Sequence, residues 1–173
     1  MFTTQKPIAV ANYLIDLAKH ENAELTNDKL QKVLFGMQGY MLYTYNMPLF
    51  NAEFARLKKG PAISELYTLL NSKTGNLTQM IAESYGFNQA NLRVNVPMMT
   101  PKSINNPILY NRLVLIAKTL LKLKDYQLNN IILNDATWQN YRYMKNVSYY
   151  TNREICSCYL NNFNENSSEI PGF

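Results

Sequence analysis

The chain is poor in the residues on which most enzyme active sites depend. It has one histidine, two cysteines and six glycines among 173 residues. General acid–base catalysis most often uses a histidine, and His20 falls at the polar end of a predicted helix. No glycine-rich phosphate-binding motif is present, because Gly36 and Gly39 lie inside a predicted helix. We therefore expect no catalytic residue and no cofactor, and we predict that the protein is not an enzyme.

The two cysteines do not form a site together. Cys156 and Cys158 are two residues apart, so on a helix they point in nearly opposite directions. This geometry excludes a mutual disulfide and a shared metal site, and no Cys and His cluster with zinc spacing occurs elsewhere. We expect no metal site. Carboxylates that folding brings together could still hold a metal ion without leaving a pattern in the sequence.

Charged residues are also scarce, at 17% against roughly 25% in an average globular protein, while hydrophobic residues make up 47%. This balance excludes disorder over most of the chain. The net charge of +5 permits contact with nucleic acid or with an acidic protein without selecting either. No apolar run approaches the ~18 residues that span a membrane, and no signal-peptide cleavage site is evident. We expect a soluble cytoplasmic protein with no membrane partner.

Helix caps and hydrophobic periodicity predict a mainly α protein. We expect a compact single domain over residues 1–163, with about seven to eight helices and at most a small β element. A flexible tail should follow over 164–173. Asp125 and Asp135 are expected as N-caps. The predicted helices cover residues 7–20, 27–45, 65–70, 77–85, 107–124, 126–133, 136–144 and 152–162, and either Ser64 or Pro61 is expected to open the third.

Two segments are less regular. Residues 51–60 fit either a short helix or an extended segment closed by Gly60 and Pro61, and we favour the extended form. Leu92, Val94 and Val96 alternate, which is typical of a short strand or an extended loop.

The helix over 27–45 contains the stretch LQKVLFGMQGY, with two glutamines and two glycines in an apolar pattern. On a helical wheel, Gln31 and Gln38 flank the apolar stripe, where they can satisfy buried backbone groups. Gly36 and Gly39 lie on another side, where the missing side chains let a second segment approach closely. We therefore expect this helix to be surrounded on most sides.

Short motifs follow one another along the chain in a fixed order. They are ANY at 11–13, LQK at 30–32, QGY at 38–40, PLF at 48–50, GP at 60–61 and ELY at 65–67, followed by Trp138. In this order they resemble the Panacea antitoxin domain, a SocA-like family that is often phage-associated, over about residues 7–160. Where that family tends to have Ala-Trp before Gly-Pro, this chain has Arg56 and Leu57. The resemblance implies a structural scaffold of Asn12, Leu30, Gln31, Lys32, Gln38, Gly39 and Trp138.

The resemblance also implies a function, which is neutralisation of a cognate toxin by direct protein–protein binding. We expect the contact surface in residues 54–67, because this segment mixes cations with an aromatic side chain, as interfaces do. The partner's identity and the oligomeric state are not specified. The expected contact residues are Arg56, Lys58, Lys59, Gly60, Pro61, Glu65 and Tyr67.

Two alternatives remain open at this point. A nucleic-acid-binding regulatory protein would use the net positive charge and the lysines near residues 56–59 and 118–124. An adaptor that delivers a partner to a protease would use the predicted tail.

Overall fold

The helix α2 (Asn27–Tyr45) is the centre of the fold. The computed structural model describes residues 2–71, 73, 75–79, 81, 83–85, 93–141 and 148–164. The Thr26 hydroxyl accepts from the Lys29 N–H and starts α2, and Asn46 ends it in the left-handed conformation. Apart from Asp28, every residue from 27 to 42 is buried. A helix that is buried on all faces needs neighbours on all sides.

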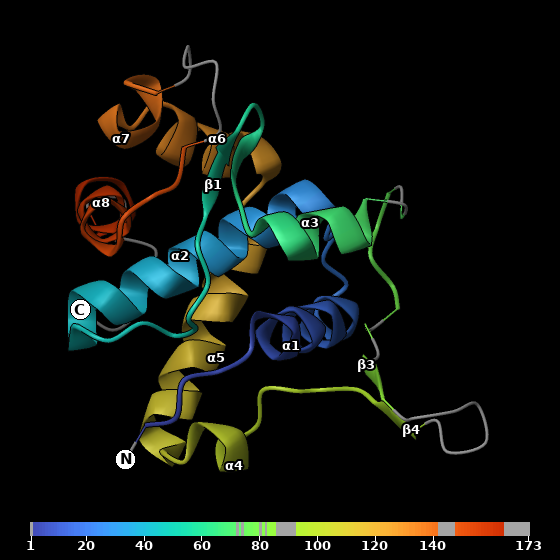
Figure 1. Cartoon of the computed structure of the whole chain (residues 1–173). Coiled ribbons are helices and arrows are strands. Elements are labelled where there is room, and N and C mark those ends of the chain that lie inside the picture. The colour runs from blue at the N-terminus through green and yellow to red at the C-terminus, as the bar shows by residue number, and fades with distance from the viewer. Residues whose placement is uncertain are drawn as a thin grey trace.

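Those neighbours come from the whole length of the chain, and Figure 1 shows α2 running through the middle of them. The mainly α architecture is confirmed, with eight α-helices in the part of the chain that the structure describes. None of these helices is long and apolar enough to cross a membrane. The elements in contact with α2 are α1 (Pro7–His20), β2 (Gly60–Ala62), α3 (Ser64–Leu70), α5 (Pro107–Lys122), α6 (Asp125–Leu133), α8 (Asn152–Cys158) and the π-helix η2 (Tyr159–Asn164).

The glycines of α2 permit two of these contacts. A Cβ at Gly39 would lie 2.7 Å from the Tyr159 Cβ, at the start of η2. A Cβ at Gly36 would lie 3.0 Å from Leu120 Cδ1 on α5. Glycine lowers the stability of the helix at these two positions, but its missing side chain lets η2 and α5 pack closely against α2.

Within the described residues, the β structure consists of two small antiparallel pairs. Strand β1 (Ala55–Leu57) pairs with β2, with Arg56 opposite Pro61, so the extended form favoured for 51–60 is correct. Strand β3 (Glu83–Tyr85) pairs with β4 (Arg93–Asn95). The free edge of β1 is extended by the chain before α8, because the Arg56 N–H donates to the Ser148 carbonyl at 2.8 Å and the Tyr150 N–H to the Phe54 carbonyl.

The helix predicted over 77–85 is wrong. Residues 77–79 are not helical and residues 83–85 form β3. The reason is the side chain of Asn12 on α1, which accepts from the Ile81 N–H at 2.6 Å and donates to the Ile81 carbonyl at 2.8 Å. Both backbone groups that a helix would use at Ile81 are therefore bonded to another element.

Several helix ends also differ from prediction, and α5 ends at Lys122, two residues before its predicted end. Asp125 is not an N-cap: α6 begins there, and the Lys124 N–H before it donates to Gln127 Oε1 at 2.8 Å. The α-helical part of the last helix, α8, is shorter than predicted and is capped by Thr151. The chain after it continues as the π-helix η2 instead of as an α-helix. Asp135 does cap α7 (Ala136–Gln139), but α7 ends five residues earlier than predicted, and residues 142–147 lie outside the described residues. So do residues 165–173 of the predicted tail.

One short helix was not predicted. Helix α4 (Pro101–Ile104) follows the alternating residues 92–96, and a capping box between Thr100 and Ser103 starts it.

Candidate protein-binding site

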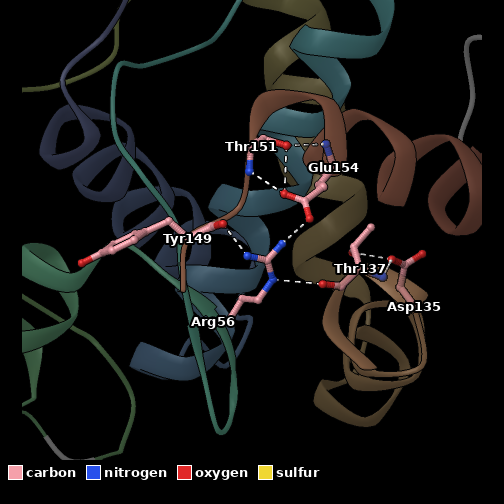
Figure 2. A network of polar contacts seen from close by, with 6 residues as sticks. All are labelled: Arg56, Asp135, Thr137, Tyr149, Thr151 and Glu154. Carbon is pink, nitrogen blue, oxygen red and sulfur yellow. Dashed lines mark hydrogen bonds and ion pairs between the residues drawn. The ribbon is translucent and has the colours of Figure 1, made fainter. Parts of the chain in front are cut away.

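The guanidinium of Arg56 is bound inside the molecule. The Arg56 side chain is 3% exposed. Its Nε donates to the Thr137 carbonyl at 3.0 Å, its Nη1 to the Tyr149 carbonyl, and its Nη2 to Glu154 Oε1 at 2.6 Å. Figure 2 shows these groups converging on the guanidinium from two segments, α7 and the chain over residues 149–154. Arg56 thus joins β1, α7 and the start of α8.

Aromatic rings cover both faces of the same guanidinium. Its central carbon lies 4.1 Å from the ring centroid of Tyr141 and 4.0 Å from that of Tyr150. Cation–π contacts strengthen when the cation is removed from water, as it is here. The expected partner-contact role of Arg56 therefore does not fit its placement.

The carboxylate that pairs with Arg56 also caps a helix. Glu154 Oε2 accepts from the Thr151 N–H at 2.8 Å and from the Thr151 hydroxyl at 2.9 Å, as part of a capping box at the start of α8. Burial acts to raise the pKa of Glu154, but the hydrogen bonds from Thr151 and Arg56 and the charge of Arg56 outweigh it. The pKa of Glu154 is therefore lowered.

The turn between β1 and β2 carries two exposed lysines, Lys58 and Lys59. Lys59 Nζ lies 2.8 Å from Asp28 Oδ2 at the start of α2, and the Tyr67 hydroxyl donates to Asp28 Oδ1 at 3.0 Å. The hydrogen bond and charge of Asp28 raise the pKa of Lys59. Asp28 thus connects the turn to α3, and the expected contact residues Lys59 and Tyr67 share one anionic partner.

The remaining expected contact residues lie in different places. Gly60 and Pro61 are buried, whereas Glu65 is exposed on α3. A hollow of about 230 Å³ lies beneath the turn, lined in part by Lys58, Lys59, Gly60, Pro61 and Tyr67. Gly60 has a φ of +123°, in the region that favours glycine, so the turn requires a glycine there. Five of the seven expected residues therefore share this hollow.

The two motif glutamines attach neighbouring chain segments to α2, as predicted from their place beside the apolar stripe. Gln38 Oε1 accepts from the N–H groups of Leu49 and Phe50, and its Nε2 donates to the Phe50 carbonyl at 3.2 Å. Gln31 Oε1 accepts from the Ile63 N–H at 3.0 Å, directly before α3. Gln31 and Gln38 therefore position the segments on both sides of β1 and β2.

The other motif residues are placed around them. Leu30 is fully buried, and Trp138 Nε1 donates to the Leu57 carbonyl at 3.3 Å. Lys32 is 4% exposed, and burial lowers the pKa of its ammonium. The Lys32 Cε would lie 3.4 Å from a Cβ at Gly60, so Lys32 passes under the β1–β2 turn.

A buried lysine one turn earlier on α2 was missed by sequence reasoning. Lys29 is 6% exposed and its Nζ donates to the Leu121 carbonyl at 2.9 Å, in the last turn of α5. A cation there is favourable because the carbonyls at a helix C-terminus carry partial negative charge. No signal in the sequence distinguishes Lys29 from an exposed lysine.

A second concave surface beside α3 was also missed by sequence reasoning. It is a groove of about 1020 Å³, which we call the α3 groove. Buried Phe50, Ile63 and Leu66 form part of its floor, while Leu69 and Tyr149 on its walls are 52% and 48% exposed. In Figure 2 the Tyr149 ring points away from Arg56, although its carbonyl faces that residue. Exposed apolar residues of this kind in a concave surface are typical of a binding site.

Within the described residues, no group of three or more His, Cys, Asp or Glu side chains could hold a metal ion. Burial raises the pKa of the Cys158 thiol to about 12, which makes it a poor nucleophile. The concave surfaces described beside α3 are the hollow under the β1–β2 turn and the α3 groove.

A comparison with known protein families gives one result. The family model described as "Antitoxin SocA-like, Panacea domain" matches residues 30–142. The resemblance predicted from motif order is confirmed over this range, which holds LQK, QGY, PLF, GP, ELY and Trp138. No match is found among curated proteins or among solved structures.

Proposed function

The chain belongs to the SocA-like antitoxin family, which is defined by the Panacea domain, and from this premise we propose that it is the antitoxin of a toxin–antitoxin module. It acts in the cytoplasm by binding its cognate toxin directly and covering the toxin's active surface. Its role is stoichiometric binding and not catalysis. The observation that carries the proposal is the family match over residues 30–142.

The geometry supports binding through the surface around α3. The hollow under the β1–β2 turn and the α3 groove lie on the two sides of residues 60–69. The exposed members of the expected contact set are Lys58, Lys59 and Glu65, with Tyr67 partly exposed. Arg56 is removed from this set because its side chain is bound internally.

The nucleic-acid alternative gains little from the placement of the lysines. Lys59 pairs with Asp28, and Lys118 pairs with Glu21 at 2.7 Å. A phosphate backbone is bound by cations that are free to approach it. Two of the lysines on which this alternative rests are thus already paired with carboxylates.

Co-expression tests the proposal. Each gene adjacent to the one that encodes this chain is expressed alone and together with it, and growth of the host is measured. We expect one neighbour to be toxic alone and harmless with the chain, and the two proteins to co-purify. Absence of toxicity from every neighbour, or toxicity without rescue, would contradict the antitoxin proposal.

A second experiment with the purified chain tests the alternative function, nucleic-acid binding. Titration with unrelated DNA and RNA at low and high salt measures any nucleic-acid binding. Binding that is tight at low salt and collapses as salt rises would favour the regulatory protein over the antitoxin.

A further inference from the structure

Two carboxylates in the α3 groove have no hydrogen bond or ion pair with the residues that the structure describes. Glu53 and Glu65 both line the groove and both are exposed. Among the side chains that the structure describes, neither makes a hydrogen bond or an ion pair. The carboxylates that do have such partners are Asp16 with His20, Glu21 with Lys118, Asp28 with Lys59, Asp135 with Thr137, and Glu154 with Arg56. The groove thus holds two unpaired negative charges on a chain of net charge +5.

These charges stand beside the apolar side chains that form the walls. Glu65 and Leu69 are four residues apart on α3, so they share one face of that helix. Both are exposed on that face and both line the groove. Tyr149 contributes a second exposed apolar wall from the segment bonded to the edge of β1.

The groove surface is therefore apolar in its floor and walls and acidic at two exposed points. Lys6 is the cation among the described lining residues, and it has a polar interaction of its own. A nucleic acid would meet two like charges here, whereas a peptide with apolar side chains and cations meets complementary groups on both counts.

We propose that the α3 groove is the docking site for an amphipathic segment of the partner protein, in which apolar side chains alternate with Lys or Arg. The apolar side chains contact Leu69, Tyr149 and the groove floor, and the cations pair with Glu53 and Glu65. This inference rests on the proposed antitoxin function for the identity of the partner. The chemistry of the groove itself does not depend on it.

The first experiment tests the groove chemistry without the toxin. Two synthetic twelve-residue peptides, one of leucine and lysine and one of leucine and glutamate in the same order, are titrated into the isotope-labelled full chain. We expect the leucine–lysine peptide to shift the backbone amide NMR signals of Glu65, Leu69 and Tyr149, and the leucine–glutamate peptide to leave them in place. Shifts that avoid these residues, or equal shifts with both peptides, overturn the proposal.

Matched charge variants define the contribution of the carboxylates. The double variant Glu53→Gln/Glu65→Gln is compared with Glu24→Gln/Asp125→Asn, which neutralises two exposed carboxylates outside the groove. We expect the groove variant to weaken binding of the leucine–lysine peptide about tenfold at low salt, and the control to change it less than twofold. Equal weakening by both pairs would reduce the effect to general charge attraction and overturn the proposal.

The apolar contact has its own pair of variants. Leu69→Ser removes an exposed wall residue, and Ile108→Ser removes an equally apolar residue that is 73% exposed elsewhere. We expect Leu69→Ser, and not Ile108→Ser, to weaken binding of the leucine–lysine peptide and of the toxin encoded by the neighbouring gene by tenfold or more. Circular dichroism verifies that both variants remain folded.

The two proposals fail in different ways. A toxin that is neutralised equally well by the chain and by both groove variants overturns the groove site and leaves the antitoxin function standing. Selective peptide binding without any toxic neighbour leaves the groove chemistry standing and removes the antitoxin function.

Discussion

At the scale of single residues, Gly39 is a position where the fold tolerates little added volume. Replacement of Gly39 by alanine would place a Cβ 2.7 Å from the Tyr159 Cβ, which lies next to the backbone and cannot move alone. The gain in helix propensity is about 1 kcal/mol, and overpacking costs about 1–3 kcal/mol. We expect Gly39→Ala to lower the free energy of unfolding by up to ~2 kcal/mol, measured by urea denaturation.

Gly36→Ala is the matched control on the same helix. The nearest atom to its new Cβ is Leu120 Cδ1 at 3.0 Å, at the end of a flexible side chain that can rotate. We expect a change within about 1 kcal/mol of zero, because the propensity gain offsets the smaller displacement. An equal loss in the free energy of unfolding for Gly36→Ala and Gly39→Ala would show that the close contact with Tyr159 does not cause the destabilisation.

The second residue-scale prediction concerns the acid stability of the Arg56 and Glu154 pair. The pKa of Glu154 is lowered in the folded chain, so the stability it contributes is present above the pKa of an unfolded glutamate, about 4.3. That stability is lost as the pH falls through the lower folded pKa, because protonation ends the interaction with Arg56. We expect the free energy of unfolding to fall on acidification below about pH 4.3, and to fall less in Glu154→Gln.

At pH 7 the same variant leaves the guanidinium of Arg56 without its counter-charge, which costs about 1.5–3 kcal/mol. Urea denaturation of Glu154→Gln at pH 7 and pH 3 measures both effects, with Glu24→Gln as an exposed control. If the free energy of unfolding falls by the same amount between pH 7 and pH 3 in wild type and in Glu154→Gln, the acid-sensitive stability does not come from the Arg56 and Glu154 pair.

At the scale of elements, a side chain of α1 binds two residues that lie between α3 and α4 in the sequence, Ile81 and Pro97. The Asn12 side chain accepts a hydrogen bond from the Ile81 N–H and donates to the Ile81 carbonyl. It also donates to the Pro97 carbonyl at 2.8 Å. We expect Asn12→Ala to raise hydrogen exchange of the Ile81 amide at least tenfold, because the amide loses its only acceptor among the described residues. The exchange of α5 amides should stay unchanged. Slowed or unaltered exchange at Ile81 would mean that another contact protects it.

The elements that could be predicted from the sequence are those with local signals. Helices α1, α2, α5 and α8 combine caps or an N-terminal proline with helical periodicity, and their positions were predicted within a few residues, apart from the α8 end. The absence of the helix predicted over 77–85 was not evident from the sequence, because the Asn12 side chain that bonds Ile81 lies 69 residues earlier in the chain. The close approach of Tyr159, at the start of η2, to Gly39 likewise leaves no periodic pattern in the sequence.

The candidate site was predictable only in part, for the same reason. The segment 54–67 was identified from its residue types, which do not distinguish the internally bound Arg56 from the exposed Lys58. The α3 groove combines Glu65 and Leu69 with Tyr149, which is 80 residues further along the chain. Only the folded chain brings these side chains together.

At the scale of the whole molecule, binding of the toxin should stabilise the chain. A partner that binds only the folded state at one hundred times its Kd adds about 2.7 kcal/mol to the free energy of unfolding. For a chain of this size that raises Tm by roughly 5–11 °C. We expect this shift in a thermal melt with the purified toxin, and a smaller shift at the same toxin concentration for Glu53→Gln/Glu65→Gln. If the chain prevents toxicity in the host but its Tm does not change when the purified toxin is added, direct binding would be contradicted.

The central position of α2 has a consequence for synthesis of the protein on the ribosome. Helix α2 is complete at Tyr45, but η2 and α8, which cover its Gly39 side, end at residues 164 and 158. At ~5–20 residues per second, an emerging chain would carry the uncovered helix for about 6–24 s. During that time its apolar surface is available to chaperones and proteases, and a chain released before η2 emerges cannot complete its core.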